Sequence, residues 1–383
     1  MKKEINIGLV GYKFMGKAHS HAYKDVASFF KLKAKPVMKA ICGRDEKQVK
    51  KFGKDFGWES YETSWERLVK REDIDVIDIC TPGNLHKVIA LSAAKEGKDI
   101  ICEKPLANSL AEAKEMLRAV KRAGVKNMVA FNYRRVPAVC LAKKLIEEGK
   151  LGKIYHFRAV YLQDWIVSPD FPLVWRLKRE LAGSGAHGDI NSHIIDLSHY
   201  LIGEITEVVG MQETFIKKRP LPKEATGLKA KSTKRMGKVT VDDTTLFLAR
   251  FKSGAVGSFE ASRLASGRKN YNYFEVNGSK GSLFFNLERL NELYFYSQED
   301  AGDTQGFKNI LVTEESHPYI SAWWPPGHII GWEHTFVHEI YDFLQSIARD
   351  KTAEPSFAEG VRCQEVLSAV ERSARGKRWV AVG

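Results

Sequence analysis

Short apolar runs alternate with amphipathic stretches through the first third of the chain. The runs lack regular polar alternation, which is typical of strands buried on both faces of a parallel sheet. Two of the stretches between them, "DEKQVKKFGKDFG" and "SLAEAKEMLRAVKRAG", have helical periodicity, and the second begins with the capping box Ser109–Glu112 and ends at Gly124. The alternation predicts a doubly wound parallel sheet. Its strands are expected at Ile5–Val10, Val37–Cys42, Val76–Cys80, Ile100–Cys102 and Met128–Phe131.

The pattern changes after about Arg134. "IYHFRAVYLQDW" alternates as a half-buried strand does, and short turns separate most of the later runs "TTLFLARF", "GAVGSFEASR", "YNYFEVNG", "GSLFFN" and "NELYFYS". These runs predict a large, open, mainly antiparallel sheet, with helices near 188–202 and 334–350 as its cover. We therefore expect an α/β fold with a first domain at 1–134 and a second, α+β domain at 135–383. A helix near 357–375 is expected to pack back on the first domain.

Length and cysteine content support this division. A chain of 383 residues with 44% hydrophobic content is long enough for two domains with sizeable cores. No apolar run approaches the roughly 20 residues that a membrane-spanning helix needs, and the N-terminal run is too short for a signal peptide. The five cysteines are odd in number and widely spaced, so we expect reduced thiols and a cytoplasmic protein.

The net charge of +13 is concentrated in one segment. Lys217–Lys238 carries nine basic residues and one acidic residue. We expect a solvated loop there, and contact with an acidic partner or another subunit stays open. Aromatic residues do not interleave the basic ones, so the segment does not predict nucleic-acid binding.

A glycine loop follows the first predicted strand. In "GYKFMG", Gly11 and Gly16 occupy the first and third positions of a dinucleotide-binding fingerprint, with Lys13 at the position of the middle glycine. Lys13 gives up the close backbone approach but puts an ammonium beside the place of a diphosphate, where Phe14 and Met15 open the helix. The loop predicts a coenzyme site.

The end of the second strand bears on the choice of coenzyme. An acidic residue at this point normally binds the ribose hydroxyls of NAD. Here the strand ends in Gly43 and Arg44. An arginine suits the 2′-phosphate of NADP, although stacking on adenine or exposure to water explains it equally, so NAD and NADP both stay open.

Two further motifs carry a family resemblance. "CTPGNLH" ends the third strand and "CEKPLA" ends the fourth. With the glycine loop, "GSGAHGDINSHIIDLSHYL" and "PSFAEGVRCQEVLSAVERS", the whole chain resembles the Gfo/Idh/MocA family of nicotinamide-dependent sugar and polyol oxidoreductases. It is most similar to the levoglucosan dehydrogenase-like subgroup, whose members resemble glycoside 3-dehydrogenases.

The resemblance implies a fold and a set of functional residues. The fold is an N-terminal Rossmann domain followed by a domain with a large open sheet, whose face often forms a homodimer or homotetramer. Coenzyme contacts beyond the glycine loop and Gly43–Arg44 are expected from Thr81, Pro82, Asn84, His86, Glu103, Lys104 and Asn132. His86 suits a helix cap equally well.

Lys104, Asp189 and His193 are the predicted catalytic residues. Oxidation of a secondary alcohol needs a hydride acceptor, a base for the hydroxyl proton and a cation for the developing alkoxide. Lys104 follows an apolar strand at the edge where parallel sheets bind ligands, and Pro105 is expected in a cis peptide. By resemblance, His193 is the general base and Asp189 orients the substrate or the imidazole. The spacing of these two places them on one helix face.

A sugar-binding wall is predicted from aromatic and planar polar groups at strand ends. Packing or an interdomain salt bridge explains each of these residues equally well. His187, Asp189 and His193 are also able to ligate a divalent ion, but the family chemistry uses none, and we predict no metal. The wall residues are Tyr133, Arg134, Gln163, Trp165, Trp175, Arg176 and His334, with Lys104, Asp189 and His193 beside the substrate.

These observations predict an NAD(P)-dependent dehydrogenase. It would oxidise a ring hydroxyl, by resemblance that of C3, of a pyranose, an anhydrosugar such as levoglucosan, or a glycoside. Its partners are a small sugar or polyol and other copies of the chain, without nucleic acid or membrane. The alternatives are an inositol dehydrogenase, an NAD-dependent glycosidase that oxidises C3 transiently, and a non-enzymatic sensor.

Overall fold

A computed structural model describes residues 4–223 and 232–383. The chain forms two compact units: Met1–Arg135 with Ile330–Arg362, and Val136–Ile329 with Cys363–Gly383. The first change of unit falls within two residues of the predicted boundary. The return of Ile330–Arg362 to the first unit is a feature that the two-segment division of the sequence does not contain.

The first unit is built on a six-stranded sheet of order β3-β2-β1-β4-β5-β6. All of its strand pairs are parallel, as predicted. The strand β3 was not predicted, because its three residues SYE are only half-buried and form no apolar run. The strands are β1 (Glu4–Val10), β2 (Lys35–Cys42), β3 (Ser60–Glu62), β4 (Val76–Ile79), β5 (Asp99–Glu103) and β6 (Asn127–Ala130).

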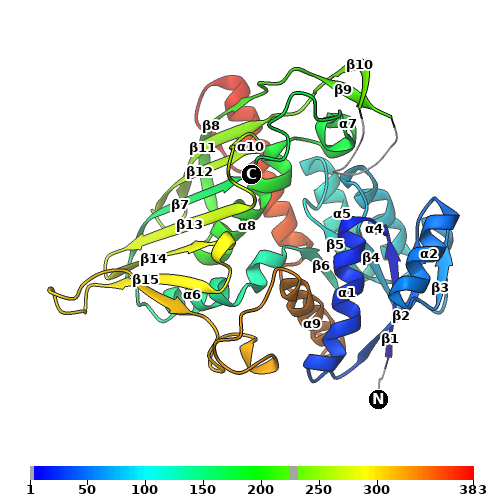
Figure 1. The fold of residues 1–383 in the computed structure, drawn as a ribbon, viewed down its shortest axis with the longest axis horizontal. Coiled ribbons are helices and arrows are strands. Elements are labelled where there is room, and N and C mark those ends of the chain that lie inside the picture. Colours follow the sequence, from blue (N-terminus) through cyan, green and yellow to red (C-terminus); the bar gives the residue numbers. More distant parts are fainter. Residues whose placement is uncertain (1–3, 224–231) are drawn as a thin grey trace. The chain divides into compact units, whose positions relative to one another are not determined.

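The helices of this unit follow the local signals of the sequence. The side chain of Ser109 accepts a hydrogen bond from the Glu112 N–H, and Gly124 closes the same helix in the left-handed region with φ 69°. In Figure 1, α1 and α9 lie side by side along the unit, in agreement with their contacts. The helices are α1 (Phe14–Phe29), α2 (Glu46–Phe56), α3 (Trp65–Val69), α4 (His86–Lys95), α5 (Leu110–Ala123) and α9 (His334–Ala348).

The second unit contains a nine-stranded sheet of order β16-β15-β14-β13-β7-β12-β11-β8-β17. Figure 1 labels its strands β7, β8 and β11 to β15 side by side. It is mainly antiparallel, as predicted, with β12 and β7 paired in parallel. Its strands are β7 (Ile154–Leu162), β8 (Ile205–Glu213), β11 (Thr244–Phe251), β12 (Val256–Ser262), β13 (Tyr271–Gly278), β14 (Gly281–Asn286), β15 (Glu292–Ser297), β16 (Lys308–Leu311) and β17 (Val380–Ala381).

Alternation in β11 shows how this sheet has one buried face. Phe247, Ala249 and Phe251 are buried, whereas Leu246 and Leu248 between them are exposed. Helices of the same unit pack on strands of the sheet. They are α6 (Pro137–Glu147) and α8 (Ser192–Leu201), and Ser373 in the later turns of α10 (Phe357–Gly376) accepts a hydrogen bond from Gly210 of β8. The short helix α7 (Arg179–Ala182) belongs to the same unit.

The helix α10 contains the last boundary between the units, after Arg362. Its first residue, Phe357, donates its N–H to Asn127 in the first unit at 2.8 Å. Farther along, the Leu367 carbonyl lies 2.9 Å from His187 Nε2 in the second unit. Only the start of this helix therefore belongs with the first unit.

The basic segment corrects a sequence expectation. Lys217–Lys238 was predicted to be a solvated loop, but β9 (Lys218–Pro222) and β10 (Ser232–Lys238) form an antiparallel ribbon, and residues 224–231 lie outside the described part. Arg219 within it is 0% exposed and donates hydrogen bonds to the carbonyls of Ile166 and Ser168. The segment therefore carries a buried anchor as well as solvated charges.

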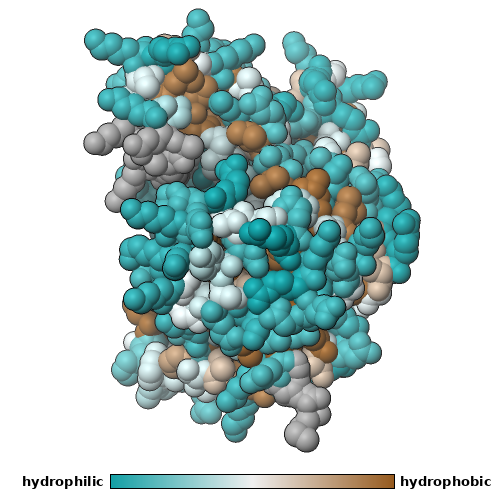
Figure 2. All heavy atoms as spheres, turned by 90° about the vertical axis from the view of Figure 1, so that its right-hand side faces the viewer, coloured by the Kyte–Doolittle hydropathy of each residue, from teal (hydrophilic) through white to brown (hydrophobic). Residues whose placement is uncertain are grey.

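The surface is predominantly polar. Figure 2 shows one face covered mainly by hydrophilic residues, with hydrophobic residues in small separate patches. Among the described residues, no helix is long and apolar enough to span a bilayer. All five cysteines are free thiols.

Candidate active site

Both glycines of the dinucleotide loop are required by close contacts. Gly11 has φ 107°, and a Cβ there would lie 2.6 Å from the Cys80 carbonyl oxygen. A Cβ on Gly16 would lie 1.8 Å from the Gly11 carbonyl oxygen. Any side chain would therefore push α1 away from the loop.

The start of α1 suits a diphosphate. Phe14 begins the helix, and no side chain caps its N-terminus at Lys13. The first N–H groups of a helix point outward and attract anions. Phe14 is 57% exposed, and its ring stacks on Trp332 at 5.5 Å. The loop residues thus fit an NAD-type coenzyme, with Met15 half-buried behind them.

Lys13 points toward α2. Its Nζ lies 2.8 Å from Gln48 Oε1 and 4.9 Å from the centre of the Tyr12 ring. Contact of this ammonium with the diphosphate, predicted from the sequence, stays a prediction. Gly43 is needed beside Tyr12, because a Cβ there would lie 2.1 Å from that ring.

The end of β2 carries an exposed arginine, followed by an aspartate whose carboxylate is hydrogen-bonded. Arg44 is exposed. Asp45 is the N-cap of α2, and its two carboxylate oxygens accept hydrogen bonds from the Gln48 N–H at 3.0 Å and the Gln48 side-chain amide at 2.6 Å. The carboxylate that would bind ribose hydroxyls is therefore already engaged with α2.

The turns after β4 and β5 are joined by His86. Its ring is 1% exposed, with Nε2 2.9 Å from the Thr81 carbonyl oxygen and Nδ1 3.1 Å from that of Pro105. Burial lowers the pKa of His86, and the backbone carbonyls that face its ring oppose that shift. Pro82 and the exposed Asn84 lie in the first turn. The predicted coenzyme contact of His86 is untested, and the structure gives the ring a role in holding the two turns.

The Lys104–Pro105 peptide is cis, as predicted. Lys104 is half-buried at the carboxyl end of β5. Its backbone N–H donates to Glu103 Oε2 at 3.1 Å, and Glu103 is only 4% exposed. The predicted coenzyme ligand Glu103 is thus a buried group beside Lys104, the predicted catalytic lysine.

The segment after β6 is more buried than a binding wall would require. Asn132, Tyr133 and Arg134 lie in a 3₁₀ turn and are 4%, 5% and 6% exposed. Asn132 donates its amide to Thr335 Oγ1 in α9 at 2.8 Å. His334 opens α9, its Nδ1 accepts the Gly331 N–H at 3.1 Å, and burial lowers its pKa. The predicted contacts of these residues with coenzyme or sugar remain predictions.

In the second unit, a buried aspartate fixes the segment that carries Asp189. Asp242 accepts hydrogen bonds from the N–H groups of Gly185 and His187, both at 2.7 Å. A Cβ on Gly185 would lie 1.8 Å from the Asp242 carbonyl oxygen, so only glycine fits there. A single π turn follows over His187–Asn191 and leads into α8. Such turns recur at functional sites.

Arg263 is the residue of this site that sequence reasoning missed. Its side chain is 1% exposed, and Nη2 donates to Asp189 Oδ2 at 2.6 Å and to the Gly185 carbonyl oxygen at 3.0 Å. Asp189 keeps 28% of its side chain exposed. The one sequence signal was a basic residue directly after an apolar strand.

His193 lies one turn after Asp189, at 6% exposure, with its ring 5.8 Å from that of Tyr161.

The alternative interpretation of His187, Asp189 and His193 as metal ligands is weakened at His187. His187 Nε2 lies 2.9 Å from the Leu367 carbonyl oxygen and Nδ1 lies 3.2 Å from the Asn191 amide, so both nitrogens are engaged.

Part of the predicted sugar wall is one connected group. Trp165 donates Nε1–H to Gln163 Oε1 at 2.9 Å, and Gln163 donates to Asn270 Oδ1 at 2.9 Å. The Arg263 guanidinium lies 5.5 Å from the Trp165 ring. Trp175 and Arg176 stack on each other at 4.4 Å. Gln163 and Trp165 are thus tied to the arginine that holds Asp189.

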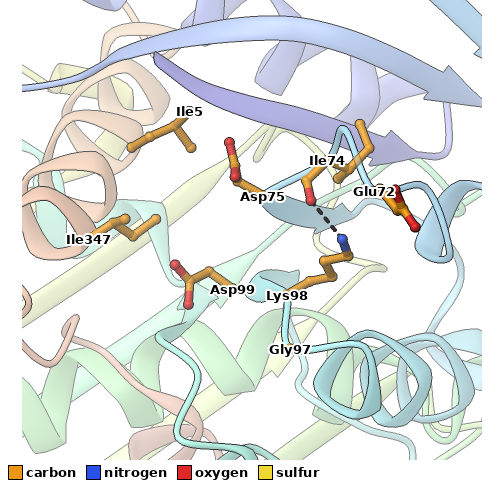
Figure 3. A pocket seen from close by; sticks show the side chains of 8 residues that line it. All are labelled: Ile5, Glu72, Ile74, Asp75, Gly97, Lys98, Asp99 and Ile347. Carbon is orange, nitrogen blue, oxygen red and sulfur yellow. Dashed lines mark hydrogen bonds between the residues drawn. The ribbon is translucent and has the colours of Figure 1, made fainter. Parts of the chain in front are cut away.

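A cavity of about 340 Å³ lies elsewhere in the first unit. Figure 3 shows Asp75, Lys98 and Asp99 around it, with Lys98 bonded to the Ile74 carbonyl at 2.8 Å. It lies at the amino ends of β4 and β5. Open α/β sheets bind ligands at the opposite edge, so this cavity is not the candidate site.

Comparison with known proteins agrees with these features. Residues 5–131 match the family described as "Oxidoreductase family, NAD-binding Rossmann fold", and residues 139–284 match the "GFO/IDH/MocA C-terminal domain". Levoglucosan dehydrogenase of Pseudarthrobacter phenanthrenivorans is 44% identical over 387 residues, covering 99% of this chain and 98% of that protein.

Solved structures give the same result. An oxidoreductase domain protein from Kribbella flavida is 48% identical, and a levoglucosan dehydrogenase in complex with NADH and levoglucosan is 44% identical. Each has a TM-score of 0.95, with 100% of both chains covered. The predicted family and fold class are confirmed.

Proposed function

We propose that this chain, which belongs to the Gfo/Idh/MocA family of oxidoreductases, oxidises the C3 hydroxyl of levoglucosan or a closely related pyranose with NAD. The observation that carries the proposal is the full-length likeness to levoglucosan dehydrogenase, at 44% identity over 99% of the chain. The fit of the Gly11–Gly16 loop to a diphosphate supports the coenzyme part.

Each unit contributes residues suited to the chemistry. When bound, the nicotinamide ring accepts the hydride from the carbinol carbon. Lys104 supplies a cation that stabilises the developing alkoxide. In the second unit, His193 accepts the hydroxyl proton, and Asp189, held by Arg263 at 2.6 Å, orients the sugar or the imidazole. Trp165 and Gln163 offer an aromatic face and an amide to the sugar.

NAD is the proposed coenzyme because solved relatives are described as complexes with NADH. The exposed Arg44 favours a 2′-phosphate, and Asp45 already accepts two hydrogen bonds from Gln48 instead of standing ready for ribose hydroxyls. NADP is therefore the second candidate, and activity with both coenzymes is to be compared.

We also propose a homo-oligomer formed through the open face of the nine-stranded sheet. Met211, Leu246, Leu248 and Val256 lie on neighbouring strands of that face and are 39% to 58% exposed. Contiguous exposed apolar side chains mark interaction surfaces. Sedimentation of the wild type and of Leu248→Lys tests this: a monomeric wild type would refute it.

The decisive experiment is absorbance at 340 nm with NAD or NADP and a panel of levoglucosan, glucose, methyl glucosides, xylose and inositols. Steady NADH formation with a pyranose, and a 3-keto product by NMR, is the expected result. Lys104→Met should lose turnover while retaining NADH binding. A preference for inositols would refute the substrate assignment. Glycoside cleavage without accumulated NADH would refute net oxidation in favour of hydrolysis.

A further inference from the structure

Ionisable side chains lie buried together in the first unit, behind the turn that carries Lys104. His19 and Asp78 are 0% exposed, Glu339 is 1% exposed and Glu103 is 4% exposed. They come from α1, β4, α9 and the end of β5. Burying charge is costly, so each charged group in such a cluster needs a partner.

His19 joins two of the carboxylates. Its Nδ1 lies 2.8 Å from Asp78 Oδ2, and its Nε2 lies 3.1 Å from Glu103 Oε1. An ionised carboxylate only accepts hydrogen bonds, so a ring between two of them must donate from both nitrogens and is an imidazolium. Burial disfavours the charge, but the Asp78 carboxylate outweighs it, and the pKa of His19 lies well above its ordinary value.

Both carboxylates accept further hydrogen bonds. The Tyr23 hydroxyl donates to Asp78 Oδ2 at 3.0 Å, and the Cys80 thiol donates to Asp78 Oδ1 at 3.3 Å. Glu103 Oε2 accepts the backbone N–H of Lys104 at 3.1 Å. A continuous path of hydrogen bonds therefore runs from Asp78 through His19 and Glu103 to Lys104.

The same residues invite a metal interpretation. Ligand atoms of His19, Asp78 and Cys80 all lie within 4.8 Å of one another. A divalent ion would need a neutral imidazole and a thiolate. Burial raises the pKa of Cys80 well above its ordinary value, and the thiol donates to Asp78 Oδ1. The hydrogen bonds account for every ligand atom without an ion.

We propose that His19 is a positioning residue for the reaction: it holds Glu103, and through Glu103 the backbone amide of Lys104, against the helix that begins at the dinucleotide loop. The inference rests on the proposed role of Lys104. Phe14 starts α1 and His19 lies in its second turn, so one side chain links the coenzyme loop to the catalytic turn. A displacement of about 1 Å at such a turn can cost about 10²-fold in rate.

The two ring nitrogens allow a matched pair of variants. In His19→Asn, the side-chain amide takes the place of Nδ1, so the variant keeps the hydrogen bond to Asp78 and loses the one to Glu103. In His19→Gln, the side-chain amide takes the place of Nε2, so the variant keeps the hydrogen bond to Glu103 and loses the one to Asp78. Tyr23→Phe is the control, since it removes a hydrogen bond to Asp78 without touching Glu103.

The kinetic result expected is a split between these variants. His19→Asn should lower kcat by about 10²-fold, whereas His19→Gln and Tyr23→Phe stay within about threefold, with unchanged NADH affinity. Equal losses of kcat in Asn and Gln would mean a purely structural role and would overturn the proposal. One bound zinc per wild-type chain, lost in both His19 variants, would overturn it too.

Amide hydrogen exchange separates this proposal from the proposed function. Because Pro105 has no N–H, the residue that follows Lys104 adds no exchanging amide to the peptide in which the exchange of the Lys104 amide is measured. It should exchange faster in His19→Asn only, whichever substrate the enzyme uses. Unchanged exchange there overturns the link even if turnover falls. If neither His19 variant folds, Glu103→Asp, too short to bridge His19 and Lys104, must show the same faster exchange.

Discussion

Replacing Arg263 with methionine tests how Asp189 is held. The guanidinium is 1% exposed and lies 2.6 Å from Asp189 Oδ2. A hydrogen bond to a charged group contributes about 1.5–3 kcal/mol. Asp189 is 28% exposed and regains some hydration when it loses its partner, so we take the lower half of that range, about 2 kcal/mol. Loss of the bond to the Gly185 carbonyl adds about 1 kcal/mol.

We therefore expect Arg263→Met to lose about 3 kcal/mol of unfolding free energy in urea titrations. Its kcat/KM for the sugar should fall roughly 30-fold or more, because about 2 kcal/mol of Asp189 orientation is lost. Arg263→Lys keeps the positive charge but lacks the branched guanidinium, so it can donate to Asp189 or to the Gly185 carbonyl but not to both. Its stability and its kcat/KM should lie between those of the wild type and Arg263→Met.

Arg219→Met is the matched control. Arg219 is equally buried, but its hydrogen bonds go to the carbonyls of Ile166 and Ser168 rather than to a carboxylate. It should lose comparable stability and keep kcat within about threefold. The reasoning would be refuted if Arg263→Met kept its kcat/KM despite the lost stability, or if Arg219→Met lost as much kcat.

Three further predictions concern the first unit. Gly16→Ala places a Cβ 1.8 Å from the Gly11 carbonyl oxygen and should abolish NADH binding measured by fluorescence, whereas Gly306→Ala, with open space around it, should not. Burial raises the pKa of Glu339 well above 4.5, so the folded chain holds a proton that the unfolded chain releases, and the contribution of Glu339 to stability should fall as pH rises above 4.5; the stability difference between Glu339→Gln and wild type in urea titrations should change with pH accordingly. Burial lowers the pKa of His338 from 6.5 to about 3, which acts in the opposite direction: its contribution should fall by roughly 2–3 kcal/mol from pH 7.5 to 4.5, and His338→Asn, which keeps an amide donor, should remove that contribution.

Local signals predicted the fold well where the sequence itself carries the cause. The capping box at Ser109 and the left-handed Gly124 are set by neighbours within one helical turn. Buried parallel strands were found from their apolar runs. Ser60–Glu62 was missed because half-buried polar residues form a strand only through pairing with β2, which no local pattern records.

The basic segment shows the limit of charge as a signal. Its composition correctly indicated exposure for most of its described lysines, but it also led to the prediction of a loop. Arg219 is fully buried because the backbone carbonyls of Ile166, Ser168 and Phe171 accept its hydrogen bonds. A guanidinium enters a core when such acceptors surround it, and those acceptors lie about 50 residues away in sequence.

The same reason explains which residues of the proposed mechanism the sequence hid. Lys104 was recognisable because its motif is local, and Gly11 and Gly16 because their spacing is. The role proposed for His19 depends on Asp78 and Glu103, which lie 59 and 84 residues away in sequence. The role proposed for Arg263 depends on Asp189, which lies 74 residues away. A histidine on a helix or an arginine after a strand has an ordinary explanation until the fold brings a carboxylate to it. Since buried charges need such partners, the residues that hold a catalytic group in place are found from contacts, while the group itself is found from its motif.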